Sequence, residues 1–573
     1  MKVVIVGGVA GGASAAARIR RLDEDAQIII FERSGYISYA NCGLPYYVGG
    51  VIEDKSELTL QTPDSFRDRF RIDVRTRHEV TAIDPKTKTV TVCGLDSGRE
   101  YTESYDKLLL SPGARPTIPQ LSGVDLENVF SLRTVEDTLR IRRYIEERNP
   151  ESVIIAGGGY IGVEMAENLL EIGLQVTIVQ RPDQLLSPFD ADMAALIHAK
   201  LRSKGVGLLL GESVMGFEAD GDLVKTLLRD GKVLASDMVI LAIGVTPDTA
   251  LAKNAGLELG VKGSIIVNEK METSAKDVYA VGDAVQVKHY VTGADALISL
   301  AGPANKQGRI AADNICGKTS RFTGSMGSSV IKLFDMTAAA TGINEKTASA
   351  AGIGIEKVVL SPASHASYYP GAKTMVMKVI CDRNTQKLLG AQIIGRDGVD
   401  KRIDVIATAI HAGLTGQELK ELDLAYAPPY SSAKDPVNMA GFMFENLFDG
   451  LVKQFQYNEI EALPRDGSVT LLDTRTRAEY DRGHVDGFIN IPVDELRVRI
   501  GEIAAGKPVY VMCQSGLRSY IACRILTQNG YDCYNLSGGY SFYSAVMNDR
   551  QTATEAYPCG MEKREYGAKA YGR

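Results

Sequence analysis

Two glycine-rich turns, each between an apolar strand and a helix-forming stretch, constrain the fold of this chain more than any other feature. The first, Gly7 to Gly12, follows the apolar run 3–6 and opens a helix-forming stretch at 13–21, and the next strand ends at Glu32. In such a unit the glycines let the backbone approach a pyrophosphate, and the acid bonds a ribose hydroxyl. Val9 replaces the middle glycine of GxGxxG, so the flanking strand, helix and acid carry this prediction.

A second copy of the unit begins with the strand 153–156. The turn Gly157 to Gly162, the helix 163–172 and the strand 176–179 follow it. Two units about 150 residues apart predict two bound nucleotides in an α/β protein. Gln180 and Arg181 stand where an acid would favour NADH, and Arg181 could accept a 2′-phosphate, so the choice between NADH and NADPH stays open.

Three short segments extend the scheme. The strands at 108–114 and 241–247 each end in a small-residue turn and are interpreted as crossovers between domains. A further strand, 278–281, closes on Gly282 and Asp283, whose carboxylate can bond a ribityl hydroxyl. The first nucleotide domain is therefore predicted to be discontinuous, with the second inserted into it.

Cys42 is the reactive side chain of the run 38–46, Ser-Tyr-Ala-Asn-Cys-Gly-Leu-Pro-Tyr. Glycine and proline beside it predict a turn, where a thiolate can meet a substrate. No second cysteine lies within a few residues, so the dithiol of most disulfide reductases is missing. A redox cycle at Cys42 must pair it with a thiol from outside the motif.

Net charge and cysteine usage narrow the functional classes. A charge of −7 and a pI near 5.6, without a basic block, argue against a nucleic-acid partner. Eight cysteines without a regular framework predict reduced thiols in a reducing compartment. With no signal-peptide pattern and no membrane-spanning apolar run, we expect a cytoplasmic protein without membrane association. No metal site is predicted.

A separate α/β unit begins near residue 469. Its strand 509–512 delivers Cys513, and the loop from Cys513 to Arg518 opens a helix. Backbone N–H groups and the helix dipole then surround the sulfur, which suits an anion or a persulfide. The Cys-x4-Arg spacing is one residue shorter than the Cys-x5-Arg of related phosphatases and suits sulfur better than phosphate. Residues 551–573 are interpreted as a polar tail, in which no role is assigned to Cys559.

Together, the two glycine turns, the Asn-Cys-Gly-Leu-Pro-Tyr run, the Gly-Asp strand and Tyr-Ala-Pro-Pro-Tyr at 426–430 resemble the single-cysteine flavoprotein disulfide reductases. Within them the chain is most similar to the coenzyme A-disulfide and coenzyme A persulfide reductase branch that carries a C-terminal rhodanese domain. The NADH oxidase and peroxidase branch has a histidine where Ala10 stands, which argues for a sulfur substrate.

The resemblance implies sites for FAD and for NADH or NADPH. Glu32 would bind the FAD ribose, Asp283 would lie near the ribityl chain, and Tyr160 would gate the nicotinamide. Glu164 is expected to pair with Lys55 close to the flavin. The full implied set of cofactor-binding residues is Gly7, Gly8, Ala10, Gly12, Glu32, Arg33, Lys55, Ala114, Gly157, Gly159, Tyr160, Gly162, Glu164, Gly244, Gly282 and Asp283.

The resemblance also implies a coenzyme A site and a homodimer. Arg18 and Arg21, three residues apart on one helix face, suit the anionic adenosine phosphates. The implied coenzyme A residues are Ser14, Arg18, Arg21, Ser38, Asn41, Asn305 and Lys434. Tyr368 and Tyr426 of a partner subunit would reach the active site, where a phenol can donate a proton. The implied catalytic residues are Cys42, Cys513, Arg518, Tyr368 and Tyr426.

The predicted architecture has two Rossmann-like nucleotide-binding domains, an α+β dimerisation domain and a C-terminal α/β rhodanese domain. The boundaries are 1–112 with 245–322 (FAD), 113–244 (NAD(P)H), 323–445 (dimerisation), 446–462 (linker), 463–550 (rhodanese) and 551–573 (tail). The expected enzyme reduces coenzyme A persulfide, polysulfide or coenzyme A disulfide through a Cys42–coenzyme A mixed disulfide, with Cys513 supplying or accepting sulfane sulfur. An NADH oxidase or peroxidase, a rhodanese sulfurtransferase and a redox-sensing binding protein remain alternatives. The physiological sulfur substrate and the direction of sulfur transfer stay open.

Overall fold

The computed structural model describes residues 1–554 and divides into two compact units. The first unit contains Met1–Leu185 and Gly205–Gly327. The second contains Leu186–Lys204 and the described residues from Ser328 on. No helix in the described part of the chain is both long and apolar enough to cross a membrane.

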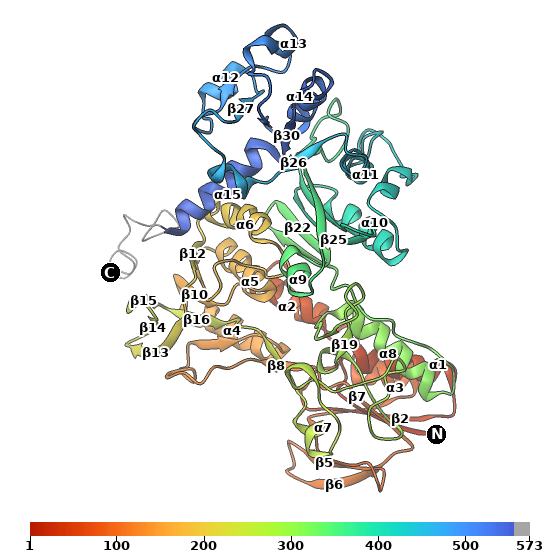
Figure 1. Cartoon of the computed structure of the whole chain (residues 1–573). Coiled ribbons are helices and arrows are strands. Elements are labelled where there is room, and N and C mark those ends of the chain that lie inside the picture. Colours follow the sequence, from red (N-terminus) through yellow and green to blue (C-terminus); the bar gives the residue numbers. More distant parts are fainter. Residues whose placement is uncertain (555–573) are drawn as a thin grey trace. The chain divides into compact units, whose positions relative to one another are not determined.

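A five-stranded parallel sheet forms the first layer of unit one. Its order is β18-β7-β1-β2-β3, from Val278–Ala280, Lys107–Leu110, Lys2–Val6, Gln27–Glu32 and Asp73–Thr76. Val3, Val4 and Ile5 are completely buried, as expected for a parallel strand covered on both faces. Helices α1 (Ala10–Leu22) and α8 (Ala301–Ile315) lie side by side (Figure 1). β18 pairs with β7, although strands of the second sheet lie between them in the sequence. The residues that form this layer are therefore not continuous in the chain.

The second parallel sheet of unit one has the order β12-β11-β10-β16-β9. Its strands are Gly207–Leu210, Gln175–Gln180, Ser152–Ala156, Met238–Leu241 and Val129–Ser131, and its helices include α4 (Val135–Arg148) and α5 (Tyr160–Glu171). The chain runs from the first sheet to the second through β8 (Ala114–Pro116) and returns through β17 (Val245–Pro247), and these two strands pair antiparallel. These are the two segments interpreted from sequence as crossovers.

Smaller elements complete unit one. Two antiparallel sheets consist of β4 (His78–Asp84), β5 (Thr89–Gly94) and β6 (Glu100–Ser104), and of β13 (Val214–Asp220), β14 (Leu223–Leu228) and β15 (Val233–Ser236). The remaining elements are α2 (Leu44–Val48), α3 (Pro63–Phe70), α7 (Ala250–Asn254), β19 (Val287–Lys288) and β20 (Asp295–Ala296).

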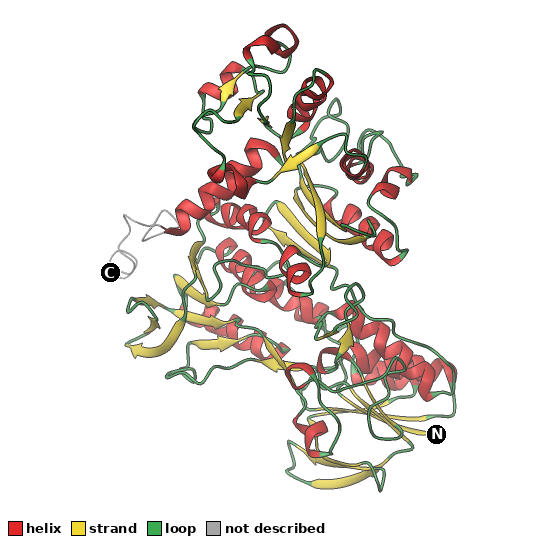
Figure 2. Cartoon of the chain, viewed as in Figure 1, coloured by secondary structure: helices red, strands yellow, loops and turns green. Residues whose placement is uncertain are grey.

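Unit two contains a five-stranded antiparallel sheet against which helix α10 (Val399–His411) packs (Figure 2). The strand order is β21-β22-β25-β24-β23, from Ser329–Leu333, Met336–Gly342, Leu388–Gly395, Val376–Asp382 and Ile355–Leu360. Helices α6 (Ala191–Ser203), α9 (Glu345–Ala350) and α11 (Pro436–Phe448) belong to the same unit. By sequence α6 falls within the predicted 113–244 domain, yet its contacts place it in unit two.

A parallel sheet of order β26-β30-β29-β27-β28 forms the C-terminal domain. The strands are Lys453–Phe455, Cys533–Leu536, Val509–Met512, Thr470–Asp473 and Ile489–Asn490. The helices are α12 (Arg477–Asp481), α13 (Leu496–Arg499), α14 (Leu517–Gln528) and α15 (Gly539–Thr554). The predicted α/β class is confirmed, whereas the residue-level domain boundaries stay predictions. Cys559 lies outside the described residues.

Candidate active site

The first glycine turn brings the backbone of two strands into close contact. Gly7 has φ +96°, and a Cβ there would lie 2.1 Å from the carbonyl oxygen of Ser111. A Cβ on Gly12 would lie 1.9 Å from the carbonyl oxygen of Gly7. The backbone N–H of Gly8 donates to Glu32 Oε2 at 2.9 Å, so the buried carboxylate holds the turn against the end of β2. Ala10 begins α1 directly after this turn.

A cavity of about 400 Å³ extends from this turn along the carboxyl ends of the strands. Of the predicted residues, Gly7, Glu32, Arg33, Asn41 and Ala114 line it. Such a concave site at the strand ends is where open α/β sheets bind nucleotides. The residues present therefore fit a dinucleotide.

Arg133 lines this cavity and contacts Asp283, which follows β18. Its guanidinium forms an ion pair with Asp283 at 2.7 Å, and Gly282 has φ +82°. The Asn41 amide donates to the Arg133 carbonyl at 3.0 Å and accepts from its guanidinium at 3.2 Å. No motif surrounds Arg133 in the sequence, so sequence reasoning missed it.

Cys42 lies on the one-turn helix Asn41–Gly43 immediately before α2. The Cys42 residue is exposed. Protein atoms still surround its sulfur, and the resulting desolvation raises the thiol pKa above its ordinary value. The Glu164 carboxylate adds to this rise, and Arg133 opposes it. Burial, with the Glu167 charge, raises the pKa of Glu164 to about 7. The Glu164 carboxyl group can therefore exchange a proton near neutral pH.

The described structure does not form the expected ion pair between Lys55 and Glu164. Lys55 is exposed, and its Nζ lies 5.0 Å from the centroid of the Tyr36 ring. No ion pair joins it to Glu164 in the described structure. The pairing of Lys55 with Glu164 stays a prediction.

The second glycine turn repeats the first with an amide in place of the acid. Gly157 has φ +113°, and a Cβ there would lie 2.3 Å from the Ala242 carbonyl oxygen. The Gly158 backbone N–H donates to Gln180 Oε1 at 2.8 Å, just as Gly8 donates to Glu32. Gln180 therefore supplies the turn's hydrogen bond without a negative charge, while Arg181 is exposed.

The other predicted residues of this unit lie at helix and strand ends. Gly159 caps α5, Tyr160 is its first residue, and a Cβ on Gly162 would lie 2.0 Å from the Gly157 carbonyl oxygen. Gly244 has φ +116° between β16 and β17, and its carbonyl accepts from Thr117 at 2.9 Å.

A separate cleft of about 340 Å³ lies between α1, α3 and α8. The predicted residues Ser14, Arg18, Arg21, Ser38 and Asn305 line it, together with Gln61, Phe66, Phe70 and Arg309, which sequence reasoning missed. Asn41 instead lines the dinucleotide cavity, and Lys434 is an exposed residue of unit two. Three arginines beside two aromatic rings suit a ligand with phosphates and a flat base.

Two arginines of this cleft differ: Arg18 is held by an ion pair, whereas Arg21 is exposed to solvent. Arg18 Nε donates to Asp313 Oδ1 at 2.8 Å, which holds the guanidinium in place. Arg21 is exposed on the next turn of α1. Ser14 donates to the Asn305 side-chain oxygen, which ties α1 to α8.

Tyr368 and Tyr426 come together in unit two, with their phenol oxygens 2.6 Å apart. Both rings are exposed in the single chain, at 73% and 45%. The hydrogen bond from Tyr368 raises the pKa of Tyr426. The paired phenols are therefore open to contact with another surface.

Cys513 is buried at the end of β29. Its Sγ accepts hydrogen bonds from the Gly516 backbone N–H at 3.1 Å and from Ser519 Oγ at 3.2 Å. Arg518 lies at the start of α14, and both of its terminal nitrogens bond the Glu479 carboxylate, at 2.7 and 2.8 Å. Ser519 and Glu479 were not predicted. Donors converging on one sulfur suit a thiolate or persulfide.

The segment after β30 closes over this loop. The Tyr540 N–H donates to the Cys513 carbonyl at 2.8 Å, and a Cβ on Gly539 would lie 2.7 Å from the Ser515 nitrogen. A cavity of about 350 Å³ opens beside it, lined by Arg475, Glu479, Arg482, Gly483, Gln514 and Tyr540. The Cys513 loop is therefore held from both sides next to a basic cavity.

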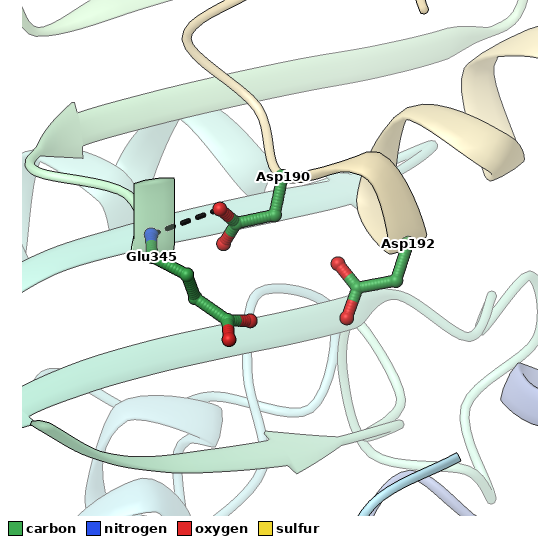
Figure 3. A group of neighbouring side chains, drawn as sticks. All are labelled: Asp190, Asp192 and Glu345. Atoms are coloured by element: carbon green, nitrogen blue, oxygen red, sulfur yellow. Dashed lines mark hydrogen bonds between the residues drawn. The ribbon is translucent and has the colours of Figure 1, made fainter. Parts of the chain in front are cut away.

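Asp190, Asp192 and Glu345 gather elsewhere in unit two (Figure 3). Lys378 places its Nζ 2.5 Å from Asp192, 2.6 Å from Glu345 and 3.2 Å from Asp190. This cluster is therefore an ion-pair network, in which the buried ammonium takes the place that a cation would need.

The chain is similar to known proteins over most of its length. The pyridine nucleotide-disulphide oxidoreductase model matches residues 1–308, its dimerisation domain 328–436 and the rhodanese-like domain 456–545. A Staphylococcus aureus protein named coenzyme A disulfide reductase is 38% identical over 442 residues, 77% of this chain and 99% of that protein.

Two solved structures are similar over nearly the whole chain. Reduced Bacillus anthracis CoADR-RHD is 48% identical, with TM-score 0.93, covering 96% of this chain and 98% of that one. An NAD-dependent persulfide reductase from A. fulgidus is 38% identical, with TM-score 0.89, covering 95% and 100%. With a family model spanning more than half of its length and relatives this similar, the chain belongs to the pyridine nucleotide-disulphide oxidoreductase family and carries a C-terminal rhodanese domain.

Proposed function

We propose that this enzyme uses NAD(P)H to reduce coenzyme A persulfide, polysulfide and coenzyme A disulfide at Cys42, and that Cys513 handles the sulfane sulfur. The observation that carries the proposal is the cleft that contains Arg18, Arg21 and Arg309. Ser38 lines this cleft four residues before Cys42, so a ligand held there by its phosphates lies on the segment that presents the thiol. The names of two similar proteins, a coenzyme A disulfide reductase and an NAD-dependent persulfide reductase, support the same substrate class.

Members of this family use FAD and NAD(P)H. When bound, the flavin supplies two-electron transfer from the nicotinamide to sulfur. Gly7 and Gly12 allow the close backbone packing that shapes the first turn. Glu32 fixes that turn, and Gln180 fixes the second without charge. Neither Gln180 nor Arg181 would repel a 2′-phosphate, so the preference between NADH and NADPH belongs to the test below.

The sulfur chemistry begins with the Cys42 thiolate as nucleophile. With coenzyme A disulfide it forms a Cys42–S–S–CoA bond and releases one CoA thiolate. With coenzyme A persulfide it forms the same mixed disulfide and releases HS⁻. Two electrons from NAD(P)H then cleave that bond, which returns the Cys42 thiolate and free coenzyme A.

Tyr368 and Tyr426 would protonate the leaving thiolate. Their exposure in one chain, the match to a dimerisation domain and their mutual hydrogen bond support a homodimer in which each subunit lends this pair to its partner. A phenol that is hydrogen-bonded to a second phenol can donate its proton and have the charge shared.

Cys513 would carry sulfur to the carrier thiol. Its persulfide, held by Gly516 and Ser519, passes the outer sulfur to the thiolate of coenzyme A, forming CoA–S–S⁻ and returning the Cys513 thiolate. The basic cavity beside the loop suits an anionic donor or acceptor. A pathway that consumes NAD(P)H and keeps seven described cysteines as free thiols fits the expected cytoplasmic location.

Stopped-flow kinetics test the proposal. The enzyme is reduced with NADH or with NADPH, then reoxidised with coenzyme A persulfide, coenzyme A disulfide or dioxygen, in the wild type and in the Cys42→Ser and Cys513→Ser variants. We expect sulfur-dependent reoxidation that Cys42→Ser abolishes. Full persulfide turnover by Cys42→Ser would overturn the proposal.

The same experiment separates the other candidates. Fast dioxygen consumption that survives Cys513→Ser would indicate an oxidase. Thiosulfate:cyanide transfer that survives Cys42→Ser and ignores NAD(P)H would indicate a sulfurtransferase alone. A single turnover with every sulfur compound would indicate a redox sensor.

A further inference from the structure

A buried arginine, Arg402 of helix α10, contacts the two segments that carry Tyr368 and Tyr426. Tyr368 belongs to the segment 361–375 between β23 and β24, and Tyr426 belongs to the segment 422–435 before α11. Neither segment contains a helix or a strand. Contacts outside regular secondary structure therefore hold the two phenol oxygens 2.6 Å apart.

The guanidinium of Arg402 bonds both segments at once. Its Nη2 donates to the Ser364 carbonyl at 2.9 Å in the first segment and to Asp435 Oδ2 at 2.9 Å in the second. Its Nη1 donates to the Gly398 carbonyl at 3.0 Å, at the start of α10. Arg402 and Asp435 are 1% and 2% exposed. A buried guanidinium is costly unless it is paired and hydrogen-bonded, and here it is both.

Ser431 adds a direct link between the same two segments. Its hydroxyl donates to Asp435 Oδ2 at 2.5 Å and accepts from Arg402 Nη2 at 3.3 Å. Its carbonyl oxygen accepts from the backbone N–H of Ala366 at 2.9 Å. Ser431 is completely buried, so these hydrogen bonds are shielded from water. The arginine, the carboxylate and the serine thus form one closed polar network between the segments.

This network continues through the backbone to both tyrosines. Ala366, which donates to Ser431, lies two residues before Tyr368. On the other side, the Ser431 N–H donates to the carbonyl of Ala427 at 3.1 Å, and Ala427 directly follows Tyr426. Each exposed ring is therefore attached closely to a buried hydrogen bond.

We propose that Arg402 is a positioning residue that holds Tyr368 and Tyr426 together as one proton-donating pair. The inference rests on the proposed function, in which this pair protonates the leaving thiolate. A guanidinium is a rigid planar fork, so it fixes a carbonyl and a carboxylate in set directions at the same time, whereas an ammonium is a point charge and fixes neither direction. Because Arg402 is buried, it acts only through the two segments that it joins.

The variant Arg402→Lys tests the inference, because it keeps the positive charge beside Asp435 and removes the fork. A crystal structure of this variant reads the positioning without any substrate. We expect the phenol oxygens of Tyr368 and Tyr426 to separate beyond hydrogen-bonding distance, and phenols that stay 2.6 Å apart would overturn the inference. A wild type that reduces no coenzyme A compound would overturn the proposed function, while this spacing still decides the role of Arg402.

Kinetics of the FAD-loaded enzyme show whether the positioning serves catalysis. Arg402→Lys should lower kcat for coenzyme A disulfide by about tenfold, since a misplaced catalytic group loses the benefit of orientation. Flavin reduction by NAD(P)H should keep its wild-type rate, because both glycine turns lie in unit one. Arg383→Lys is the matched control, an exposed arginine of unit two that bonds Glu356 and the Ile355 carbonyl. An unchanged kcat in Arg402→Lys, an equal loss in the control or an equally slowed flavin reduction would contradict the proposal.

Two further variants separate positioning from general damage. In a chain that already carries Tyr368→Phe and Tyr426→Phe, Arg402→Lys should cost nothing more in kcat, because no phenol is left to position. A further loss of similar size there would refute the role of Arg402. Ser431→Ala leaves the Arg402–Asp435 pair intact and should cause a several-fold loss of kcat that also vanishes in the double-phenylalanine chain. This variant keeps the test decisive if Arg402→Lys does not fold, since full kcat in Ser431→Ala would count against the network.

Discussion

The phenol oxygens of Tyr368 and Tyr426 lie 2.6 Å apart, although 58 positions separate them in the chain. Each phenol therefore finds a hydrogen-bond partner in its own subunit, while both rings stay exposed. A proton shared between the two is available to whatever approaches this pair.

Replacing Tyr426 with phenylalanine should lower kcat for coenzyme A disulfide by about 10²-fold, the contribution of a single general acid. Because the hydrogen bond from Tyr368 raises the pKa of Tyr426, the phenol keeps its proton in alkaline solution, and wild-type kcat should hold to higher pH than in Tyr368→Phe. Steady-state kinetics across pH measure both effects. An unchanged kcat in Tyr426→Phe would show that the Tyr426 phenol does not act as the proton donor.

Mixing two inactive variants should restore activity if each subunit lends its tyrosines to the other. In a heterodimer of Cys42→Ser and Tyr426→Phe subunits, one of the two sites has both residues intact. Random reassociation gives half heterodimers, so roughly one quarter of wild-type activity is expected. Mixtures as inactive as their components would place the tyrosines in the site of their own chain.

Removing Arg21 should weaken ligand binding without slowing the chemistry. Its exposed guanidinium lines the cleft on α1, and losing one phosphate contact should raise KM for coenzyme A disulfide by about tenfold, or about 1.4 kcal/mol. Arg67→Ala is the matched control, because that arginine pairs with Asp64 on the surface of α3. Equal KM values for the two variants would remove Arg21 from the coenzyme A site.

Replacing Lys378 with methionine should strongly destabilise unit two. Burial would lower the pKa of this lysine, but Asp192, Asp190 and Glu345 outweigh burial and raise it. The variant leaves three neighbouring carboxylates without that ammonium, at a cost of about 3–5 kcal/mol. Lys357→Met, which removes a partly exposed partner of Glu345, should cost less than about 1 kcal/mol. Urea unfolding compares them, and similar losses would contradict the network.

Glu164 should make the enzyme less stable as pH rises. Its pKa, raised by burial to about 7 from 4.5, means that the folded state binds more protons than the unfolded state between these values. The stability is therefore fully present below pH 4.5 and is lost as pH rises through 7, by at most about 3 kcal/mol. Glu164→Gln should flatten this part of the unfolding profile. If the stability of the wild type does not change over this pH range, Glu164 does not have a raised pKa.

Local patterns predicted the parts of the site that depend on neighbouring residues. The turns at Gly7 and Gly157 were predictable because strand, glycine turn and helix follow one another in the sequence. The Cys513 loop was predictable for the same reason. These predictions needed only backbone geometry that glycine permits and that a side chain would block.

Contacts between distant segments could not be predicted from the sequence. Gln180 looked like a missing acid, although its amide oxygen makes the same hydrogen bond to Gly158 that Glu32 makes to Gly8. Arg133 and Glu479 carry no motif, and their partners lie 150 and 39 positions away. The pairing of Lys55 with Glu164, which the resemblance implies, also joins distant segments and stays a prediction.

The short segment Leu186–Lys204 limits how this protein can be divided. A gene fragment that starts at Ser328 would encode the dimerisation and rhodanese parts but omit Asp190 and Asp192, leaving Lys378 buried with Glu345 alone. It would also omit His198, which contacts Asp549 of α15. The C-terminal half is therefore not a portable module, and recombination that transfers it to another reductase must transfer α6 as well.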